Sequence, residues 1–567
     1  MTERDSLSIV LAGEAGQGIN TVEKILVSIF KVCGYNVFST KEYMSRVRGG
    51  INSISIRLSS KKVSAYSENT DILFCLSKGI PERLKDRIND DTLLVGEADN
   101  IKGDSIKEQQ KAGAPLKEIS EKLGGKIYIN TVAAGIITGL LGIEENISKR
   151  QIEKIFDGKN EDIIFKNIKA VAEGADYGLK LKEKRELKYE LGQGAETEEE
   201  IFINGSEAVA LGALAGGCNF ISSYPMSPST GVLTFLAQNA KDFGVIAEQA
   251  EDEISAVNMA IGAWYAGARA LVTTSGGGFA LMQEGVSLAG MHESPLVIHL
   301  AQRPGPATGL PTRTEQGDLE LALYSGHGEF PRIIFAPGSL EDAFYLTQKA
   351  FNLADKYQIP VFILTDQYLL DSYYNIPGLD MKKIQNKKHF IETVKDYKRY
   401  KYTDTGISPR GIPGNGDGLV CADSDEHGEE GYITEDMDVR VRMVDKRLKK
   451  ADGIIDDSEE PELIGNPEFS ILVLGWGSTY HVIKESLGNT GREDMAFLYF
   501  NQVYPLHPKI KDYMSRAEVT AIIENNATSQ FSRLIKRETG KDMDKKLLKY
   551  NGMPFSVEEV TGFLKAL

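Results

Sequence analysis

The stretch NFISSYPMSPST, residues 219–230, runs from a strand-like segment into a loop that contains Pro225 and Pro228. The two prolines fix backbone angles and therefore stiffen this loop. Further strand-like runs follow, separated by helical patterns, at residues 245–247, 270–274, 296–300, 332–335 and 361–364. Because alternating strands and helices are typical of a parallel sheet covered by helices, we predict an α/β domain over residues 203–374.

Two further α/β domains are predicted, one on each side of this domain. Residues 1–180 open with the strand-like Ser8–Ala12, the glycine-bearing turn Gly13–Gly18 and a helical pattern. Residues 466–567 restart with an apolar strand-like run at 469–474, which a glycine turn follows. The predicted fold class is therefore α/β, with three α/β domains.

The segments between these domains differ from them in composition. Residues 181–202 are mostly polar and charged, and we predict a solvated linker. Residues 375–465 contain fewer apolar residues and more Lys, Asp, Glu, Gly and Pro, so we predict a long irregular connector.

The composition argues against several function classes. The chain has 567 residues, a formal net charge of −16 and a pI of about 5.2. This balance disfavours nucleic acid as a partner, because nucleic-acid binding depends on clustered Lys and Arg. The longest uncharged stretch, residues 208–240, contains glycines and prolines that are not expected in a membrane-spanning helix.

The cysteines and histidines also restrict the chemistry. The four cysteines are far apart and form no CxxC pair, which argues against a disulfide framework, a zinc ribbon or an iron–sulfur cluster held within this chain. The seven histidines have no HxxxH or HExxH spacing, so no protein-borne metal is predicted. The N-terminal residues do not resemble a signal peptide, and we expect a cytoplasmic protein in a reducing compartment.

Two glycine motifs indicate turns more strongly than cofactor sites. Gly13–Gly18 has Ala15 where a dinucleotide fingerprint needs its middle glycine, which leaves a nicotinamide-dependent dehydrogenase as a minor alternative. Gly416–Gly418 is similar to the start of a magnesium–diphosphate motif, but no strand precedes it and we interpret it as a chance turn. The basic loop of residues 42–52 is compatible with a partner, an anion or a plain surface turn.

Acidic residues precede a helix predicted for residues 254–266. Glu251, Asp252 and Glu253 fall in its first turn, where the positive end of the helix dipole favours ionised carboxylates. Small residues on one side of this helix would let another backbone approach closely, which predicts an interface helix with the ridge Ala256, Ala260, Ala263 and Gly267.

Two loops at the carboxyl ends of predicted strands carry candidate binding groups, since open α/β sheets bind ligands at this edge. Ser222–Thr230 places several hydroxyl groups there. Residues 303–313 carry Arg303 and Arg313 among prolines and glycines, and a guanidinium matches the geometry of a carboxylate.

Taken together, these segments resemble the α subunit of the 2-oxoacid:ferredoxin oxidoreductases, in the form that has a γ domain fused ahead of it. The likeness covers nearly the whole chain. It comprises a γ-like part at residues 13–18 and 42–50, a thiamine-pyrimidine domain at 222–366, a connector at 403–410 with Glu426 and His427, and a transketolase-like C-terminal domain at 475–479 and 504–506.

The resemblance implies a carboxylate against the aminopyrimidine ring of thiamine diphosphate. Glu253 is the candidate for this role, with Glu248 and Glu251 as alternatives. The loop of residues 224–230 matches the family's YPITP loop, which is implicated in contact with the 2-oxoacid and coenzyme A, but Met226 and Ser227 replace its Ile and Thr.

The arginine loop completes the expected site, and one of Arg303 and Arg313 is expected to hold the substrate carboxylate. The residues that the resemblance assigns are Glu253, Arg313, Arg303 and Ser227 for catalysis; Glu253, Tyr224, Pro225, Ser227, Pro228 and Ser275 for cofactor binding; and Tyr224, Ser227, Ser229, Thr230, Arg303, Thr308 and Arg313 for substrate or coenzyme A.

The reaction implied is oxidative decarboxylation of a 2-oxoacid, with 2-oxoglutarate favoured, to acyl-coenzyme A and CO₂, with electrons passing to ferredoxin. The chain lacks a magnesium–diphosphate motif and a cluster-binding cysteine set. The resemblance therefore implies a β subunit that carries the Mg²⁺–diphosphate site and a [4Fe-4S] cluster, in an (αβ)₂ heterotetramer. The alternatives are a subunit of a non-oxidative thiamine diphosphate enzyme and a non-catalytic scaffold subunit.

Overall fold

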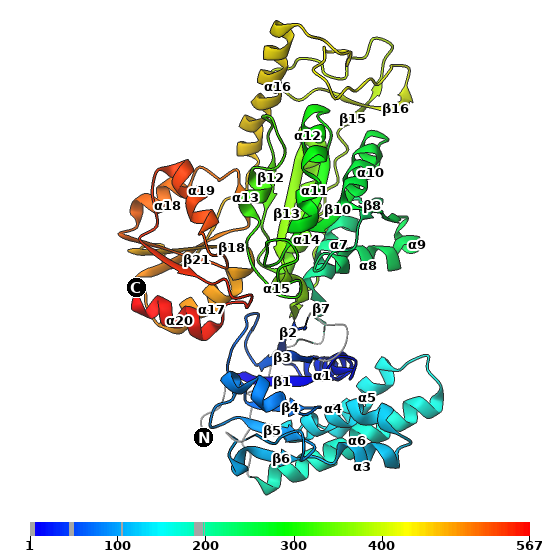
Figure 1. The fold of residues 1–567 in the computed structure, drawn as a ribbon, viewed down its shortest axis with the longest axis vertical. Helices are drawn as coiled ribbons and strands as arrows, with labels where there is room; N and C mark the ends of the chain where they lie inside the picture. Colours follow the sequence, from blue (N-terminus) through cyan, green and yellow to red (C-terminus); the bar gives the residue numbers. More distant parts are fainter. Residues whose placement is uncertain (1–5, 45–49, 104–105, 186–196, 198) are drawn as a thin grey trace. The chain divides into compact units, whose positions relative to one another are not determined.

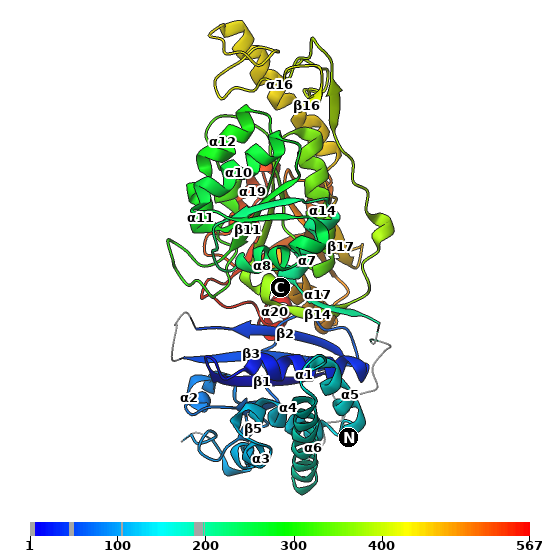
Figure 2. The same ribbon diagram turned by 90° about the vertical axis from the view of Figure 1, so that its right-hand side faces the viewer.

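The computed structural model describes residues 6–44, 50–103, 106–185, 197 and 199–567. Residues 45–49 of the predicted basic loop, and most of residues 186–198 in the predicted linker, lie outside the described residues. The chain divides into two units (Figure 1, Figure 2). The first comprises Met1–Ile203, Ser372–Gly378 and Ser556–Glu558, and the second comprises Asn204–Asp371, Leu379–Phe555 and Glu559–Leu567.

The first unit contains an eight-stranded sheet over its described residues, in the order β6-β5-β4-β1-β3-β2-β14-β7. Strand β1 pairs with β3 in antiparallel register and with β4 in parallel register, and β14, from far along the chain, pairs antiparallel with β2. The strands are β1 (Ser6–Glu14), β2 (Asn36–Glu42), β3 (Ile51–Ser59), β4 (Ile72–Cys75), β5 (Leu93–Gly96), β6 (Lys111–Gly113), β7 (Ile201–Asn204) and β14 (Tyr373–Ile376).

Helices pack on this sheet around a core of aliphatic side chains. Helices α4 and α6 approach so closely that a Cβ atom at Gly135 would clash with the backbone of Val171, and one at Gly174 with the backbone of Val132. Glycine at these positions therefore permits the contact. The helices of this unit are α1 (Ile19–Val32), α2 (Ile80–Arg83), α3 (Leu116–Lys122), α4 (Ile129–Leu141), α5 (Glu145–Ile155) and α6 (Glu161–Lys184).

The second unit is centred on a seven-stranded sheet in the order β20-β12-β13-β11-β10-β8-β9. Its neighbouring strands are parallel, except that β20 pairs antiparallel with β12. The carboxyl ends of the parallel strands therefore meet at one edge of the sheet. The strands are β8 (Phe220–Ser223), β9 (Ile246–Gln249), β10 (Ala270–Ser275), β11 (Leu296–Gln302), β12 (Ile333–Phe335), β13 (Pro360–Asp366) and β20 (Gln502–Tyr504).

Helices lie on both faces of this sheet (Figure 1, Figure 2). They are α7 (Gly205–Ala215), α8 (Thr230–Gln238), α9 (Ala240–Phe243), α10 (Glu253–Tyr265), α11 (Gly276–Leu281), α12 (Gln283–Met291), α13 (Leu319–Leu323), α14 (Leu340–Tyr357) and α15 (Gln367–Asp371). Strand β11 is buried along its whole length, which explains why its sequence is apolar except for His299 and Gln302.

A smaller five-stranded sheet, also in the second unit, has the order β17-β19-β18-β21-β22. Its strands are β17 (Glu462–Gly465), β18 (Ile471–Trp476), β19 (Met495–Phe500), β21 (Val519–Glu524) and β22 (Lys545–Leu548). The helices that accompany it are α17 (Tyr480–Thr490), α18 (Ile510–Arg516), α19 (Gln530–Thr539) and α20 (Val557–Ala566).

The prediction of an irregular connector over residues 375–465 was wrong in part. This segment contains the paired strands β15 (Phe390–Thr393) and β16 (Arg410–Gly416) and the long helix α16 (Met437–Asp456). Helix α16 has no ordinary apolar stripe, because its buried side includes Lys446, Arg447 and Lys450. A hydrophobic pattern could not reveal such a helix.

The predicted α/β fold class is confirmed by these sheets and helices. The expectation that no strand precedes Gly416–Gly418 was wrong, because β16 leads directly into this segment and ends at Gly416. The segment bends against Thr393, whose carbonyl oxygen accepts a hydrogen bond of 2.8 Å from the Asp417 amide. Within the described residues, the structure contains no helix that is both long and apolar enough to cross a membrane.

Candidate functional site

The glycine turn Gly276–Gly278 lies at the carboxyl end of β10 and brings three segments together. A Cβ atom at Gly276 would lie 2.5 and 2.6 Å from the two carboxyl oxygens of Asp318. One at Gly277 would lie 3.7 Å from the Ala307 carbonyl oxygen, and one at Gly278 would clash with the Glu253 carboxyl group. The absence of side chains on this turn therefore lets two carboxyl groups approach the backbone from different segments.

Glu253 is the first residue of α10, directly after β9. Asp252 caps the helix, since its side chain accepts a hydrogen bond of 2.7 Å from the Ser255 amide. The Glu253 side chain turns inward, with the residue only 4% exposed, and its Oε1 atom has no hydrogen-bond partner among the described residues. Glu248 and Glu251, the alternatives for its role, are exposed.

The loop after β8 carries the predicted hydroxyl groups, and they differ in exposure. Ser229 is buried, and its Oγ atom donates to the Met226 carbonyl oxygen at 2.7 Å. Ser227 is exposed, and Tyr224 is 41% exposed. Pro225, Pro228 and Thr230 are partly buried, and the peptide bond between Ser227 and Pro228 is cis.

Arg303 joins the arginine loop to the hydroxyl loop. Its Nη1 atom donates to the Ser227 carbonyl oxygen at 2.7 Å. Burial lowers the pKa of the Arg303 guanidinium, and the nearby charge of Asp318 opposes this shift. The structure therefore brings two of the predicted catalytic residues, Arg303 and Ser227, into direct contact.

Arg313 occupies the other end of the arginine loop and contacts the C-terminal part of the second unit. Its Nη1 atom lies 3.3 Å from Met553 Sδ, and its side chain packs beside Gly552. Between the two arginines, Gly309 has a positive φ of 53° and packs so tightly on Pro304 that a Cβ atom there would clash. Thr308, at this tight turn, is exposed.

Ser275 and Asp318 flank the start of α11. Ser275 is fully buried, and its Oγ atom has no hydrogen-bond partner among the residues that the structure describes. Sequence reasoning missed Asp318, which ends the loop before α13 and also has a buried oxygen, Oδ2, without a partner in the described chain. Burial and the charge of Glu315 raise the pKa of Asp318 to about 7, whereas the Arg303 guanidinium lowers it.

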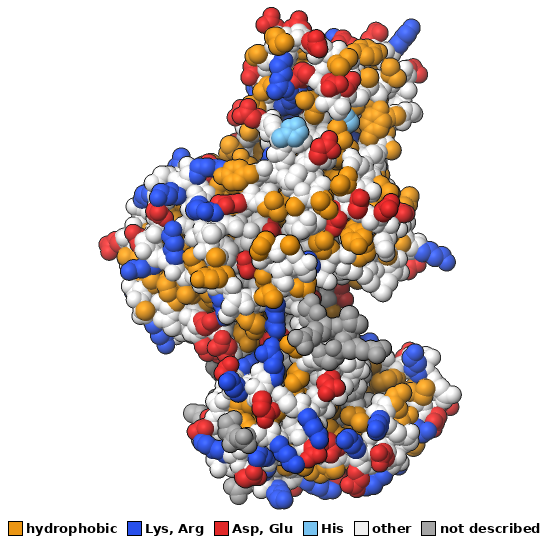
Figure 3. Space-filling view, viewed as in Figure 1, with side chains coloured by type: hydrophobic (Ala, Val, Ile, Leu, Met, Phe, Trp, Pro, Cys, Tyr) orange, Lys and Arg blue, Asp and Glu red, His pale blue; other side chains and the backbone are white. Residues whose placement is uncertain are grey.

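Helix α10 buries part of the predicted small-residue ridge. Ala256 and Ala260 are fully buried, and the Ala256 carbonyl accepts a 2.7 Å hydrogen bond from Ser222 on β8. Half of the small-residue ridge, Ala256 and Ala260, therefore packs inside its own unit, whereas Ala263 and Gly267 are partly buried, and an interface on this helix stays a prediction. Large apolar side chains are exposed on α10 and α11, namely Ile254, Met259, Tyr265 and Leu281. Apolar side chains are also scattered over the surface that Figure 3 shows.

The residues around Gly276–Gly278 fit the pyrimidine end of thiamine diphosphate. A buried carboxyl oxygen without a partner requires a hydrogen-bond donor, and the N1′ nitrogen of the pyrimidine can supply one when it is protonated. Gly278, which has no side chain, lets the Glu253 carboxyl group lie directly against the backbone, where a side chain would displace it.

Two family models match this chain. Residues 8–177 match the model described as pyruvate ferredoxin/flavodoxin oxidoreductase. Residues 211–446 match the thiamine diphosphate-binding model of pyruvate flavodoxin/ferredoxin oxidoreductase. The second range contains Glu253, the hydroxyl loop and the arginine loop, so the site lies inside a thiamine diphosphate-binding domain.

Relatives match nearly the whole chain. The 2-oxoacid:ferredoxin oxidoreductase subunit alpha of Sulfolobus sp is 32% identical over 98% of this chain and 96% of that protein. The 2-oxoglutarate oxidoreductase subunit KorA of Mycobacterium tuberculosis is 28% identical over 99% of this chain and 91% of that protein.

A solved structure agrees with the same assignment. The 2-oxoglutarate:ferredoxin oxidoreductase from Magnetococcus marinus, with 2-oxoglutarate, coenzyme A and succinyl-CoA bound, has a TM-score of 0.93 at 30% identity and covers 100% of both chains. The sequence and the fold therefore agree over the full length, and this chain belongs to the family of 2-oxoacid:ferredoxin oxidoreductase α subunits.

Proposed function

We propose that this chain forms the pyrimidine-binding half of an active site that oxidatively decarboxylates a 2-oxoacid, with 2-oxoglutarate as the favoured substrate. The observation that carries the proposal is the buried Glu253 carboxyl group, whose Oε1 atom lacks a partner in the described chain. The substrate choice is supported by relatives named 2-oxoglutarate synthase or oxidoreductase subunits and by the M. marinus enzyme, which has 2-oxoglutarate bound.

The overall reaction converts one 2-oxoacid and one coenzyme A into one acyl-coenzyme A, one CO₂ and one proton, and two electrons pass to ferredoxin. When bound, thiamine diphosphate supplies a carbon nucleophile for the 2-oxo carbonyl group and accepts the electron pair left as CO₂ departs. In this proposal, Glu253 Oε1 accepts a hydrogen bond from the N1′ nitrogen and so holds a proton on that ring.

The two loops at the sheet edge bind and orient the substrate in this proposal. Arg303 offers its guanidinium to the substrate carboxylate, because it lies beside Ser227 at the same edge as Glu253. Ser227, Tyr224, Thr230 and Thr308 supply hydroxyl groups for the 2-oxoacid or coenzyme A, whereas the buried Ser229 hydroxyl donates to the Met226 carbonyl oxygen and holds the loop in shape. Arg313 keeps the role of second candidate for the carboxylate, and Ser275 Oγ faces the cofactor.

We further propose that a β subunit completes the site with the Mg²⁺–diphosphate half and a [4Fe-4S] cluster, in an (αβ)₂ assembly that reduces ferredoxin. The exposed apolar side chains of α10 and α11 beside Glu253 support a partner on this face. The unpaired state of the four cysteines supports a reducing, cytoplasmic setting.

The division into a γ-type domain at residues 1–180, a pyrimidine-binding domain at 203–374 and a transketolase-like domain at 466–567 also stands as a proposal. Three of the four sheets in the described residues support it, one near each predicted domain, although the second and third domains belong to one unit. Strand β14, which joins the first sheet from residues 373–376, shows that a sheet and a continuous chain segment need not coincide.

The experiment compares Glu253→Gln with Glu251→Gln, the exposed neighbour, in the complex co-purified with its β subunit. We expect Glu253→Gln to lower 2-oxoglutarate- and coenzyme A-dependent ferredoxin reduction about 10²–10⁴-fold. Glu251→Gln should keep wild-type turnover. Full turnover by Glu253→Gln would indicate a scaffold, and decarboxylation without ferredoxin reduction by the wild type would indicate a non-oxidative enzyme.

A further inference from the structure

The arginine loop places Asp318 at the edge where the two candidate binding loops meet. Its backbone amide donates to the Gln302 side chain at 2.9 Å, which ties it to the carboxyl end of β11. Its two carboxyl oxygens face the backbone of Gly276, where any side chain would displace them. Asp318 is therefore held by the fold, at the start of α11, and is not a freely moving surface acid.

The groups around Asp318 leave its charge only partly balanced. From α11 it meets the Gly276 backbone, from β11 the Gln302 side chain, and from its own loop the charges of Glu315 and Arg303. The described residues include no salt-bridge partner within 4 Å of it and no donor to Oδ2. The opposite charge that acts on Asp318 is that of Arg303, whose Nη1 atom donates to the Ser227 carbonyl oxygen.

We propose that Asp318 is a positioning residue that sets the net charge which Arg303 offers to the substrate carboxylate. The inference rests on the proposed function, because it takes Arg303 as the carboxylate-binding group. When Asp318 is protonated, the guanidinium charge is uncompensated and attracts the substrate anion. When Asp318 is ionised, it neutralises that charge and repels the same anion.

The direction of the pH effect follows from this arrangement. Burial raises the pKa of Asp318 to about 7, so its carboxyl group is mostly protonated below that pH and ionised above it. Substrate binding should therefore be tightest on the acidic side and weaken as the pH rises through neutrality. Because Asp318 acts through Arg303, the effect should fall on KM and leave kcat nearly constant.

The test measures 2-oxoglutarate turnover by the holoenzyme complex from about pH 6 to about pH 8, for the wild type, Asp318→Asn and Glu320→Gln. Glu320, two residues further on, forms a surface ion pair with Arg533 and serves as the matched control. We expect the wild-type KM to rise about tenfold over this range and the Asp318→Asn KM to stay flat and low. Glu320→Gln should follow the wild type.

A binding measurement separates charge from catalysis. The ligand for calorimetric titration is 2-hydroxyglutarate, whose carboxylates stay ionised over this pH range. The wild-type Kd should rise with pH as the KM does, and the Asp318→Asn Kd should not change with pH. A wild-type pH step retained in Asp318→Asn, or a step in kcat rather than KM, would overturn the inference. A wild type without any 2-oxoacid turnover would overturn the proposed function instead.

Discussion

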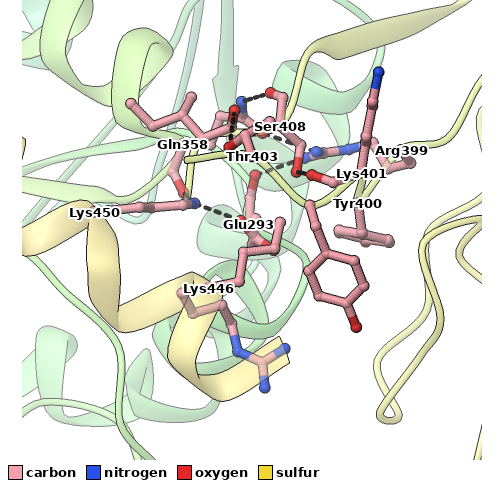
Figure 4. Close-up of polar contacts among 12 residues, drawn as sticks. Glu293, Gln358, Arg399, Tyr400, Lys401, Thr403, Ser408, Lys446 and Lys450 are labelled. Carbon is pink, nitrogen blue, oxygen red and sulfur yellow. Dashed lines mark hydrogen bonds and ion pairs between the residues drawn. The ribbon is translucent and has the colours of Figure 1, made fainter. Parts of the chain in front are cut away.

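Two buried carboxyl sites in the second unit have opposite surroundings. Glu293 is 1% exposed and forms ion pairs with Lys446 Nζ at 2.5 Å and Lys450 Nζ at 2.6 Å, both on α16 (Figure 4). Glu253, by contrast, is buried with an oxygen that has no hydrogen-bond partner among the described residues. Both Glu293 oxygens have a lysine ion-pair partner within the chain, although Oε2 meets Lys450 without hydrogen-bond geometry, whereas Glu253 Oε1 has neither kind of partner among the described residues and needs a group from outside.

The surroundings of Glu293 extend this difference. Arg399 donates to the Glu293 carbonyl oxygen at 2.7 Å and to the Gln358 side chain at 2.8 Å, so the connector is tied to the parallel-sheet layer (Figure 4). The lysines lower the pKa of Glu293 even though burial raises it, whereas burial lowers the pKa of Lys450 to about 8. A saturated buried cluster holds elements in place, and an unsaturated one is a candidate for binding.

The largest expected effect is on folding, at Glu293. Replacing it with alanine, Glu293→Ala, leaves Lys446 and Lys450 buried without their counter-ion, which should lower the free energy of unfolding by about 3–5 kcal/mol. Urea unfolding measures this. The exposed Glu251→Ala is the control and should change stability by less than about 0.5 kcal/mol. If Glu293→Ala lowered the free energy of unfolding only slightly, water would have to reach these lysines. The contrast between the Glu293 and Glu253 sites would then be weaker.

The second prediction concerns activity, at the glycine turn. The methyl group of Gly278→Ala would clash with the Glu253 carboxyl group and Thr274 Oγ1, so it should displace the acid and lower kcat/KM by about 10²-fold. Gly277→Ala, whose nearest non-neighbouring atom is 3.7 Å away, is the matched comparison and should cost only a few-fold. Equal losses in both variants would mean that Glu253 is not the group disturbed.

The sequence allowed the strands of the parallel sheet to be predicted, but not every element beside them. The runs at 270–274 and 296–300 became β10 and β11 because strands buried on both faces are almost continuously apolar. Helix α16 was missed because its buried side carries Lys446 and Lys450 where an apolar stripe would be expected. These lysines are buried because they form ion pairs with Glu293.

The candidate site shows the same limit. The residue pattern predicted a helix start after a strand, but only the family resemblance selected Glu253 among the acidic residues there; the structure buries Glu253 and places Arg303 beside Ser227. Asp318 could not be selected, because its burial depends on the loop after Arg303 folding back against Gly276. A local sequence pattern predicts where a residue lies along a helix or strand. Only the tertiary contacts of its side chain determine whether that side chain is buried and whether it is ionised.

The third prediction concerns stability and pH at Asp318. The pKa of this acid is about 7 in the folded chain and near 4 when unfolded, so the folded state binds more protons between these values. Its contribution to stability is therefore present at low pH and is lost as the pH rises to 7. Asp318→Asn should be more stable than the wild type by about 2–4 kcal/mol at pH 8, with no difference below about pH 4. Thermal unfolding across this range measures the effect, and a gain that is independent of pH would contradict the assignment.

The smallest expected effect is the stability of Glu253→Gln, and it decides whether the acid serves binding or folding. A buried carboxyl oxygen without a partner contributes nothing to holding the chain together, so an amide of the same shape should leave stability unchanged or raise it by up to about 1 kcal/mol. Glu293→Gln, made in parallel, removes the counter-ion of two lysines and should be clearly destabilising. If Glu253→Gln destabilises the chain as Glu293→Gln does, then Glu253 is a structural acid like its counterpart. Both buried glutamates would then stabilise the fold. The lack of a partner at Glu253 Oε1 would no longer support a cofactor at that position.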